Sequence, residues 1–379
     1  MTAFPRQVAV IVDPLRAGTK LPQLFTGLGH RCVGVLSQQS DSPFWRESFR
    51  PQDLLTTLEE RDGFDRLVRE LARWEISCIV PGGESGVNLT DRLTEAFPEV
   101  PGLDPATSAA RRDKYHMAQA LTAAGLSAIP HCRTRDVNAA LAWYRTATDG
   151  NAVVKPLAST SAEGVHFCAT PDELAAAFAA VRGSISLFNQ LNDEVLVQQD
   201  ISRDGATEYT VNSVSSRGLH HVTDVWRMRR QMVGATAVCV YSDLVGRDED
   251  EFAALADYCA DVLSALGVRN GTAHSEIMLT ATGPILIETG ARVEGACDPA
   301  IALSLCGYSQ NSLLPMSYLD PVGFAHAVRR PQPRPRVHAR HVYLLSPVEG
   351  HVARSPDLSA IRALPTFGGL ETSLDAVPV

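Results

Sequence analysis

Apolar and polar positions follow two different rhythms along the chain. In the first rhythm, three apolar runs rich in β-branched residues, QVAVIV, RCVGVLS and ISCIVPGG, predict buried parallel strands. Before the third run, RDGFDRLVRELARWE has the spacing of an amphipathic helix, whose apolar face is formed by Phe64, Leu67, Leu71 and Trp74. This alternation predicts a doubly wound parallel α/β domain that ends near residue 105, in the proline-rich stretch PGLDPATSAARRDK.

The second rhythm begins near residue 150 and is that of antiparallel hairpins with isolated helices. AVVK, VHFC and EVLVQQ predict short strands, and EYTVNSVSSRGLHHVTDVW predicts a long hairpin that turns at Arg217-Gly218. PDELAAAFAAVRG and DEDEFAALADYCADVLSALG each have a proline or acidic start and a glycine end, as helices do. A further helix is predicted from Lys114 to Ala124, closed by Gly125. The predicted fold class is therefore α/β followed by α+β.

One predicted hairpin places two acidic side chains opposite each other. HSEIMLT and PILIET are separated by Ala281-Thr282-Gly283, which predicts a three-residue connection with Thr280 facing Pro284. In that register Glu276 faces Glu288, with Cβ atoms about 4.5 to 5.5 Å apart. Facing carboxylates are destabilising unless a cation lies between them, and Mg²⁺ commonly takes one or two protein carboxylates. The hairpin therefore predicts a Mg²⁺ site, with a solvated hairpin of two unrelated glutamates as the alternative.

An arginine and two glycines follow this hairpin and favour the ligand site over the alternative. Arg292 comes four positions after Glu288 and has the same parity in an extended chain. Gly290 and Gly295 flank it, and residues without side chains leave room for a ligand.

A second candidate segment is the loop in NAVVKPLASTSAEGVHFC, residues 151–168. Lys155 ends an apolar run and is followed by hydroxyl and glycine residues that can wrap phosphate oxygens, namely Ser159, Thr160, Ser161 and Gly164. The stretch is not a Walker-type loop, because GxxxxGK[ST] is absent. A plain hairpin loop is the alternative.

Composition narrows the class of protein. The 379 residues carry a net charge of -9, which argues against a nucleic-acid partner. No apolar stretch reaches the roughly 20 residues that span a bilayer, so no membrane partner is expected. Eight cysteines lie far apart without a CxxC pair, which favours reduced thiols and a cytoplasmic location. The arginine- and proline-rich segment 329–340 is interpreted as a linker. The default expectation for the oligomeric state is a homodimer.

Four stretches occur together in a characteristic order: RRDKYHMAQALTAAGL, VVKPLASTSAEGV, EVLVQQDISRDGATEYTV and HSEIMLTATGPILIETGARVEG. Over residues 75–305 this series resembles the ATP-grasp superfamily of carboxylate–amine ligases. The last stretch and IVPGGESGVNLTDRL are similar to the L-amino-acid (dipeptide) ligase branch. The resemblance implies an N-terminal pre-ATP-grasp α/β domain over 1–105, a central or lid subdomain over 106–200, and a C-terminal subdomain with the metal site and an extension over 201–379.

The resemblance also implies roles for individual residues. Lys114 and Lys155 match the lysines that contact ATP phosphates, and the loop 158–164 matches the flap that closes over them. Glu276 and Glu288 match the metal ligands, and Arg292 matches the arginine that holds the transferring phosphoryl group and the reacting carboxyl. The remaining matches are Gln198, Gln199 and Ile201 for adenine, Glu208 for ribose, and Ser85 and Gly295 for the amino-acid pocket. Ser85 as an ordinary loop residue is the alternative, and Gly290 departs from the asparagine that many members carry there.

The resemblance implies an ATP-dependent ligase that forms an amide between the carboxylate of an amino acid or small acyl compound and an amine, which is an amino acid in the expected case. ADP and phosphate are the other products. A carboxylate must be activated before an amine can attack it, and lysines, Mg²⁺ and an arginine suit transfer of a phosphoryl group to form an acyl phosphate. Two alternatives stay open: a nucleotide-binding sensor or carrier, and a glycosidase that uses the paired carboxylates without ATP.

Overall fold

The computed structural model describes residues 7–233, 236–295, 298–330, 333, 338–345 and 357–369. The chain divides into two compact units, Met1–Val342 and Tyr343–Val379, and the second contains the short helix α12 (Ser359–Arg362). Cys297 and half of the predicted linker at 329–340 lie outside the described residues. Within the described ranges no helix is long and apolar enough to cross a membrane.

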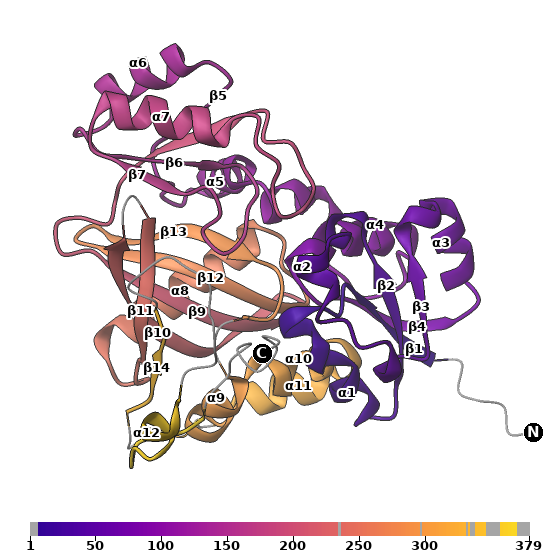
Figure 1. The fold of residues 1–379 in the computed structure, drawn as a ribbon. Coiled ribbons are helices and arrows are strands. Elements are labelled where there is room, and N and C mark those ends of the chain that lie inside the picture. The colour runs from indigo at the N-terminus through magenta and orange to yellow at the C-terminus, as the bar shows by residue number, and fades with distance from the viewer. Residues whose placement is uncertain are drawn as a thin grey trace, which may run out of the picture. The chain divides into compact units, whose positions relative to one another are not determined.

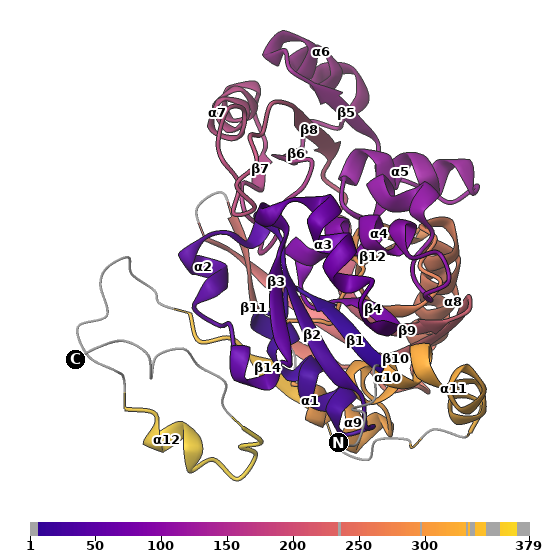
Figure 2. The same cartoon turned by 90° about the vertical axis from the view of Figure 1, so that its right-hand side faces the viewer.

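The first unit begins with the predicted parallel sheet, whose four strands have the order β3-β2-β1-β4 (Figures 1 and 2). The strands are β1 (Gln7–Val12), β2 (Arg31–Leu36), β3 (Thr56–Glu59) and β4 (Glu75–Pro81). Strand β3 was not predicted, because the half-buried edge sequence TTLE has no apolar run. The chain order reverses between β1 and β4, and ligands of open α/β sheets bind outside the carboxyl ends of the strands at such a point.

The helices of this first domain are α1 (Leu21–Thr26), α2 (Pro43–Arg46), α3 (Phe64–Leu71) and α4 (Val87–Ala96). Leu67 and Leu71 of α3 are buried in the core as predicted. Trp74 packs against the same core from the turn after the helix and not from the helix itself. The predicted helix was therefore too long at its C-terminal end by one turn.

The second sheet is antiparallel with the order β5-β8-β6-β7. It consists of β5 (His131–Thr134), β6 (Ala152–Pro156), β7 (His166–Cys168) and β8 (Val195–Gln199), with α5 (Lys114–Ala123) preceding it. Helices α6 (Val137–Ala147) and α7 (Pro171–Val181) cover one face, where Val154 and Val197 form the core (Figure 1). Lys155 and Gln198 alternate with these valines and therefore lie on the opposite face.

The third sheet has six strands in the order β13-β12-β9-β10-β11-β14. Its strands are β9 (Thr207–Ser216), β10 (Leu219–Val233), β11 (Thr236–Leu244), β12 (Gly271–Thr280), β13 (Gly283–Gly290) and β14 (Arg340–Val342). The predicted turn at Arg217-Gly218 is confirmed, with positive φ values of 51° and 81°. Helix α8 (Asp250–Ala265) buries Leu255 and Val262 against one face, and the other face carries polar side chains together with apolar contacts at Val214 and Trp226.

Helices from late in the sequence pack against the first and third sheets. They are α9 (Pro299–Cys306), α10 (Gln310–Leu319) and α11 (Pro321–Val328). Leu314 and Tyr318 of α10 join a buried cluster with Ile11 and Val80 of the parallel sheet, whereas Leu313 packs on Val214 of the third sheet. Helix α10 thus joins the two sheets by apolar contacts on both of its sides.

We predict that Leu314→Ala lowers the free energy of unfolding by about 2 to 5 kcal/mol, because it opens a cavity between α10 and the parallel sheet. Urea unfolding followed by circular dichroism measures this change. Leu303→Ala on α9 is the matched control, since Leu303 is 47% exposed and its loss should cost less than about 0.5 kcal/mol. Equal losses in the two variants would contradict this account of the core.

Candidate functional site

The β12–β13 hairpin brings the two predicted metal ligands together. Glu276 pairs with Glu288, as predicted, but the connection is shorter than expected because Thr280 pairs with Gly283. A two-residue loop, Ala281-Thr282, therefore replaces the predicted three-residue one, in line with the preference of hairpins for short loops. An irregularity between Glu276 and Ile277 then shifts the register by one residue and restores the glutamate pair.

Three carboxylates share this region of the third sheet. Burial raises the pKa of the Glu208 carboxyl, and the nearby Glu276 charge raises it further against the pull of Arg230. Burial also opposes ionisation of Glu276, but the His274 imidazole and the Arg230 guanidinium outweigh it and lower the pKa to about 2. Arg230 Nε donates to Glu208 Oε2 at 2.6 Å, and its Nη2 lies 3.8 Å from Glu276 Oε2.

The donor set fits a hard divalent cation. Glu276 and Glu288 offer only oxygen ligands, and Glu276 is ionised over the physiological pH range. No group of three or more His, Cys, Asp and Glu side chains suited to a metal occurs in the described part of the chain. Such a sparse site suits Mg²⁺, which binds through one or two carboxylates and fills its other positions with water and phosphate oxygens.

Two buried lysines face the carboxylates. Lys114 begins α5 behind the Asp113 N-cap, and its Nζ lies 2.8 Å from Glu288 Oε2. Lys155 on β6 is 4% exposed. Its burial and the Lys114 charge lower the pKa of Lys155 to about 8, although Glu288 and Glu276 act in the opposite direction. Two neighbouring buried ammonium groups form a strong site for an anion with several negative charges.

The loop between β6 and β7 is not a plain tight turn. Ser161 and Ala162 are consecutive non-glycine residues with positive φ, 55° and 57°, and Gly164 has φ 67°. Such backbone costs on the order of 1 to 3 kcal/mol per residue and is found mostly at functional sites. Lys114 Nζ donates to Ser159 Oγ at 3.3 Å, so one end of the loop already contacts a predicted phosphate ligand. Ser161 is exposed, and Thr160 is partly buried.

A buried carboxylate between two arginines was missed in the sequence. Glu84 lies in the loop after β4, at the reversal point of the parallel sheet, and is 8% exposed. Arg292 Nε donates to its Oε2 at 2.9 Å, and Arg112 Nη1 donates to its Oε1. Burial alone would raise the pKa of Glu84, but the charges of Arg112 and Arg292 hold it below its usual range.

Gly290 makes room for this arrangement. A Cβ atom at position 290 would lie 2.6 Å from Glu84 Oε2, closer than such atoms approach. A free glutamate tip could move away at little cost, but Glu84 is held by two arginines. The glycine at 290 and the buried Glu84 are therefore linked, but the glycine alone indicates only free space and does not identify position 84.

Ser85 and Gly295, the two other residues predicted to border the amino-acid pocket, take no part in the hydrogen bonds between Glu84 and the two arginines. Ser85 is 1% exposed, and its hydroxyl lowers the pKa of the Asp13 carboxyl, which burial raises by more. Gly295 is exposed, and a Cβ atom there would meet only Ala17 Cβ at 3.9 Å. Their part in substrate binding stays a prediction.

The predicted adenine-binding segment lies at the end of β8. Gln198 is buried and lines a small cavity together with Lys114, Leu286 and Ile287, so these two predicted nucleotide contacts lie close together. Gln199 donates its backbone N–H to Pro130 O at 3.0 Å, and Ile201 is half-buried just beyond.

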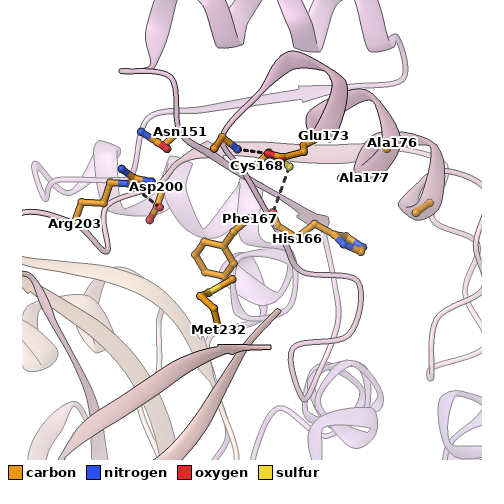
Figure 3. A pocket seen from close by; sticks show the side chains of 12 residues that line it. Asn151, His166, Phe167, Cys168, Glu173, Ala176, Ala177, Asp200, Arg203 and Met232 are labelled. Carbon is orange, nitrogen blue, oxygen red and sulfur yellow. Dashed lines mark hydrogen bonds and ion pairs between the residues drawn. The ribbon is translucent and has the colours of Figure 1, made fainter. Parts of the chain in front are cut away.

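A larger cavity of about 600 Å³ lies beside this segment and extends toward α7 (Figure 3). Asp200 and Arg203 form one wall and are joined by an ion pair of 3.4 Å, while Phe167 points toward Met232. None of the predicted phosphate or metal residues lines this cavity.

Comparisons with known proteins agree with this geometry. A family model described as the ATP-grasp domain matches residues 148–300. Dapdiamide A synthase of Enterobacter agglomerans is 30% identical over 364 residues, which cover 94% of this chain and 84% of the relative. The L-amino acid ligase of Bacillus licheniformis has a similar structure, with a TM-score of 0.75 at 18% identity over 96% of this chain and 87% of its own. N5-carboxyaminoimidazole synthetase of Staphylococcus aureus, solved with ADP, gives 0.64 at 12% identity over 82% and 77%.

We predict that Gly290→Ala lowers the free energy of unfolding by about 1 to 3 kcal/mol, because the added methyl group displaces the Glu84 carboxylate from its arginines. Gly295→Ala is the matched control and should change stability by less than about 0.5 kcal/mol, since its Cβ atom meets an ordinary contact. The urea concentrations at the midpoints of unfolding measure the difference between the two variants. Equal stability would argue against a fixed Glu84.

Proposed function

Because the chain belongs to the ATP-grasp family of carboxylate–amine ligases, we propose that it joins the carboxylate of an amino acid or small acyl compound to the amine of an amino acid. The reaction is ATP-dependent amide formation. The observation that carries the residue assignment is the pairing of Glu276 with Glu288 opposite the buried Lys114 and Lys155. The names of the relatives, a dapdiamide synthase and an L-amino acid ligase, support an amino acid as one partner.

In the proposed mechanism, one end of the site binds Mg²⁺ and the phosphates of ATP, and the other end binds the reacting acyl group. Glu276 and Glu288 hold Mg²⁺, which neutralises charge on the phosphate oxygens when it is bound. Lys114 and Lys155 align the triphosphate, and the flap around Ser159, Thr160, Ser161 and Gly164 closes over it. The γ-phosphoryl group passes to the substrate carboxylate and gives an acyl phosphate and ADP.

Arg292 acts at the other end of the site, where the acyl group reacts. Its guanidinium keeps N–H groups that can donate to a phosphoryl or carboxyl oxygen while Nε remains on Glu84. The amine then attacks the acyl carbon, phosphate leaves, and the attacking nitrogen loses a proton. Gln198, Gln199, Ile201 and Glu208 are proposed to hold the nucleoside, and Ser85 and Gly295 to border the amino-acid pocket.

We also propose the division at residues 105 and 200, which is supported by three separate sheets with their own apolar clusters. The seven described cysteines are free thiols, which supports a cytoplasmic location. A homodimer stays a prediction. Family membership favours the ligase over the sensor and the glycosidase.

We expect Glu288→Gln and Arg292→Ala each to reduce amine-dependent ADP release by at least about a hundredfold, because each removes charge stabilisation from the transferring group. The assay incubates the protein with ATP, Mg²⁺ and a pool of amino acids, and follows phosphate release and the mass of a new amide. Arg340→Ala is the control, since this arginine pairs with Asp243 on an exposed edge. Near-normal turnover in both site variants would overturn the assignment.

A second prediction concerns pH and Lys155. Its pKa of about 8 means that the ammonium loses its proton as pH rises from 7 to 9. Phosphate groups bind the charged form, so the dissociation constant of MgADP should rise by up to about tenfold over this interval. Lys155→Arg keeps its charge throughout and should flatten the profile. Isothermal titration calorimetry measures both proteins, and parallel profiles would count against Lys155 as the titrating group.

A further inference from the structure

A short hairpin reaches from the second sheet to the N-terminal domain. It comprises residues 183–192 between α7 and β8, and we call it the clasp. Its strands are joined by Gly183 N to Asn192 O at 2.8 Å and Ser186 N to Gln190 O at 2.8 Å. Asn189 takes a positive φ of 59° at the tip. The tip is therefore a defined turn with a fixed direction.

The clasp inserts an aromatic ring into the N-terminal domain. Phe188 is 1% exposed and stacks on Trp45 of α2, with ring centroids 5.6 Å apart and planes 13° apart. Leu15 and Leu36 complete the cluster around the two rings. Trp45 Nε1 also donates to Leu187 O at 2.8 Å. Any movement of the second sheet away from the N-terminal domain exposes this apolar contact, so the docked state is favoured.

Two adjacent residues of the clasp, Leu187 and Phe188, contact the two ends of the proposed active site. Leu187 N donates to Oε1 of Glu163 at 2.8 Å, and Glu163 lies in the proposed flap 158–164. On the other side, the Arg112 guanidinium lies over the Phe188 ring at 4.5 Å from its centroid. Arg112 in turn holds Glu84, which holds Arg292.

The Phe188 ring supports the position of the Arg112 guanidinium. Arg112 is 7% exposed, and its Nε and Nη2 atoms have no hydrogen-bond partner among the described residues. The face of Phe188 lies against the guanidinium, and a cation over an aromatic face is stabilised by the ring quadrupole. Without the ring, a buried arginine with unpaired donors is free to turn away from Glu84.

We propose that Phe188 is a positioning residue, and that docking of the clasp couples closure of the flap to placement of Arg112, Glu84 and Arg292. An acyl phosphate reacts with water to return the carboxylate and inorganic phosphate, so the flap must be shut while the arginine is in place. The clasp joins these two conditions in one contact. This inference rests on the proposed ligase function of the same site.

The test compares Phe188→Ala with Leu191→Ala in the full-length protein. Leu191 belongs to the same clasp but is 61% exposed, and it should leave the coupling unchanged. The measurement is phosphate released per amide formed, with MgATP and an amino-acid pair that the wild-type protein joins. Wild type should release about one phosphate per amide, and Phe188→Ala on the order of tenfold more, because its acyl phosphate meets water. A purely structural defect would lower both products together.

The Trp45→Phe variant provides a second test of the proposal. Trp45→Phe keeps a ring to stack on but loses the N–H bond to Leu187 O, so its coupling should fall between wild type and Phe188→Ala. If Phe188→Ala does not fold by circular dichroism, Trp45→Phe decides, and wild-type coupling in that variant would overturn the proposal. Wild-type coupling in a folded Phe188→Ala protein would overturn it as well.

Hydrogen exchange with MgADP separates failure of the clasp from failure of the ligase assignment. In the wild type, nucleotide should protect residues 157–165 and 183–192 together, and Phe188→Ala should remove protection from both segments. If wild type makes no amide from any amino-acid pair, the ligase proposal fails while exchange still tests the clasp. Unchanged protection in Phe188→Ala would overturn the clasp.

Discussion

Mutual repulsion between two facing glutamates is the constraint that organises this protein. Glu276 and Glu288 lie on neighbouring strands, and like charges in such positions are stable only when cations accompany them. Lys114 Nζ lies 2.8 Å from Glu288 Oε2, and Arg230 Nη2 lies 3.8 Å from Glu276 Oε2. Because a buried charge without its partner is costly, the start of α5 and the strands β10 and β12 must keep their places relative to β13.

The second group of charges is separate from the first and has an excess of positive charge. Glu84 is one carboxylate shared by two arginines, Arg112 and Arg292. The excess positive charge suits an incoming carboxylate or a phosphoryl oxygen, which the acidic hairpin alone would repel. In the proposed site, the carboxylates of the end that would bind Mg²⁺ are matched by the charges of Lys114, Lys155 and Arg230, whereas the end that would bind the acyl group has an excess of positive charge.

Local pattern was enough to predict much of the fold and the pairing of the two glutamates. Strands β1, β2 and β4, the turn at Arg217-Gly218 and the Glu276–Glu288 pair follow from periodicity within short stretches, whereas β3, β5 and β11 were not predicted. The glutamate pair was found despite a wrong loop length, because the irregularity beside Glu276 cancels the one-residue error. Contacts between distant segments were not predictable in this way. The packing of Leu314 on the parallel sheet, the Glu84–Arg112 pair and the Phe188–Trp45 stack depend on tertiary structure and leave no periodic signal.

Three consecutive residues at the start of α5 connect the two groups of charges. Arg112 pairs with Glu84, Asp113 caps the helix by accepting from Tyr115 N at 2.8 Å, and Lys114 pairs with Glu288. A capped helix start has little conformational freedom, so the backbone sets the separation between the guanidinium and the ammonium. Phosphoryl transfer depends on alignment more than on covalent chemistry by the protein. In the proposed mechanism this segment is therefore a fixed spacer between the phosphate end and the acyl end of the site.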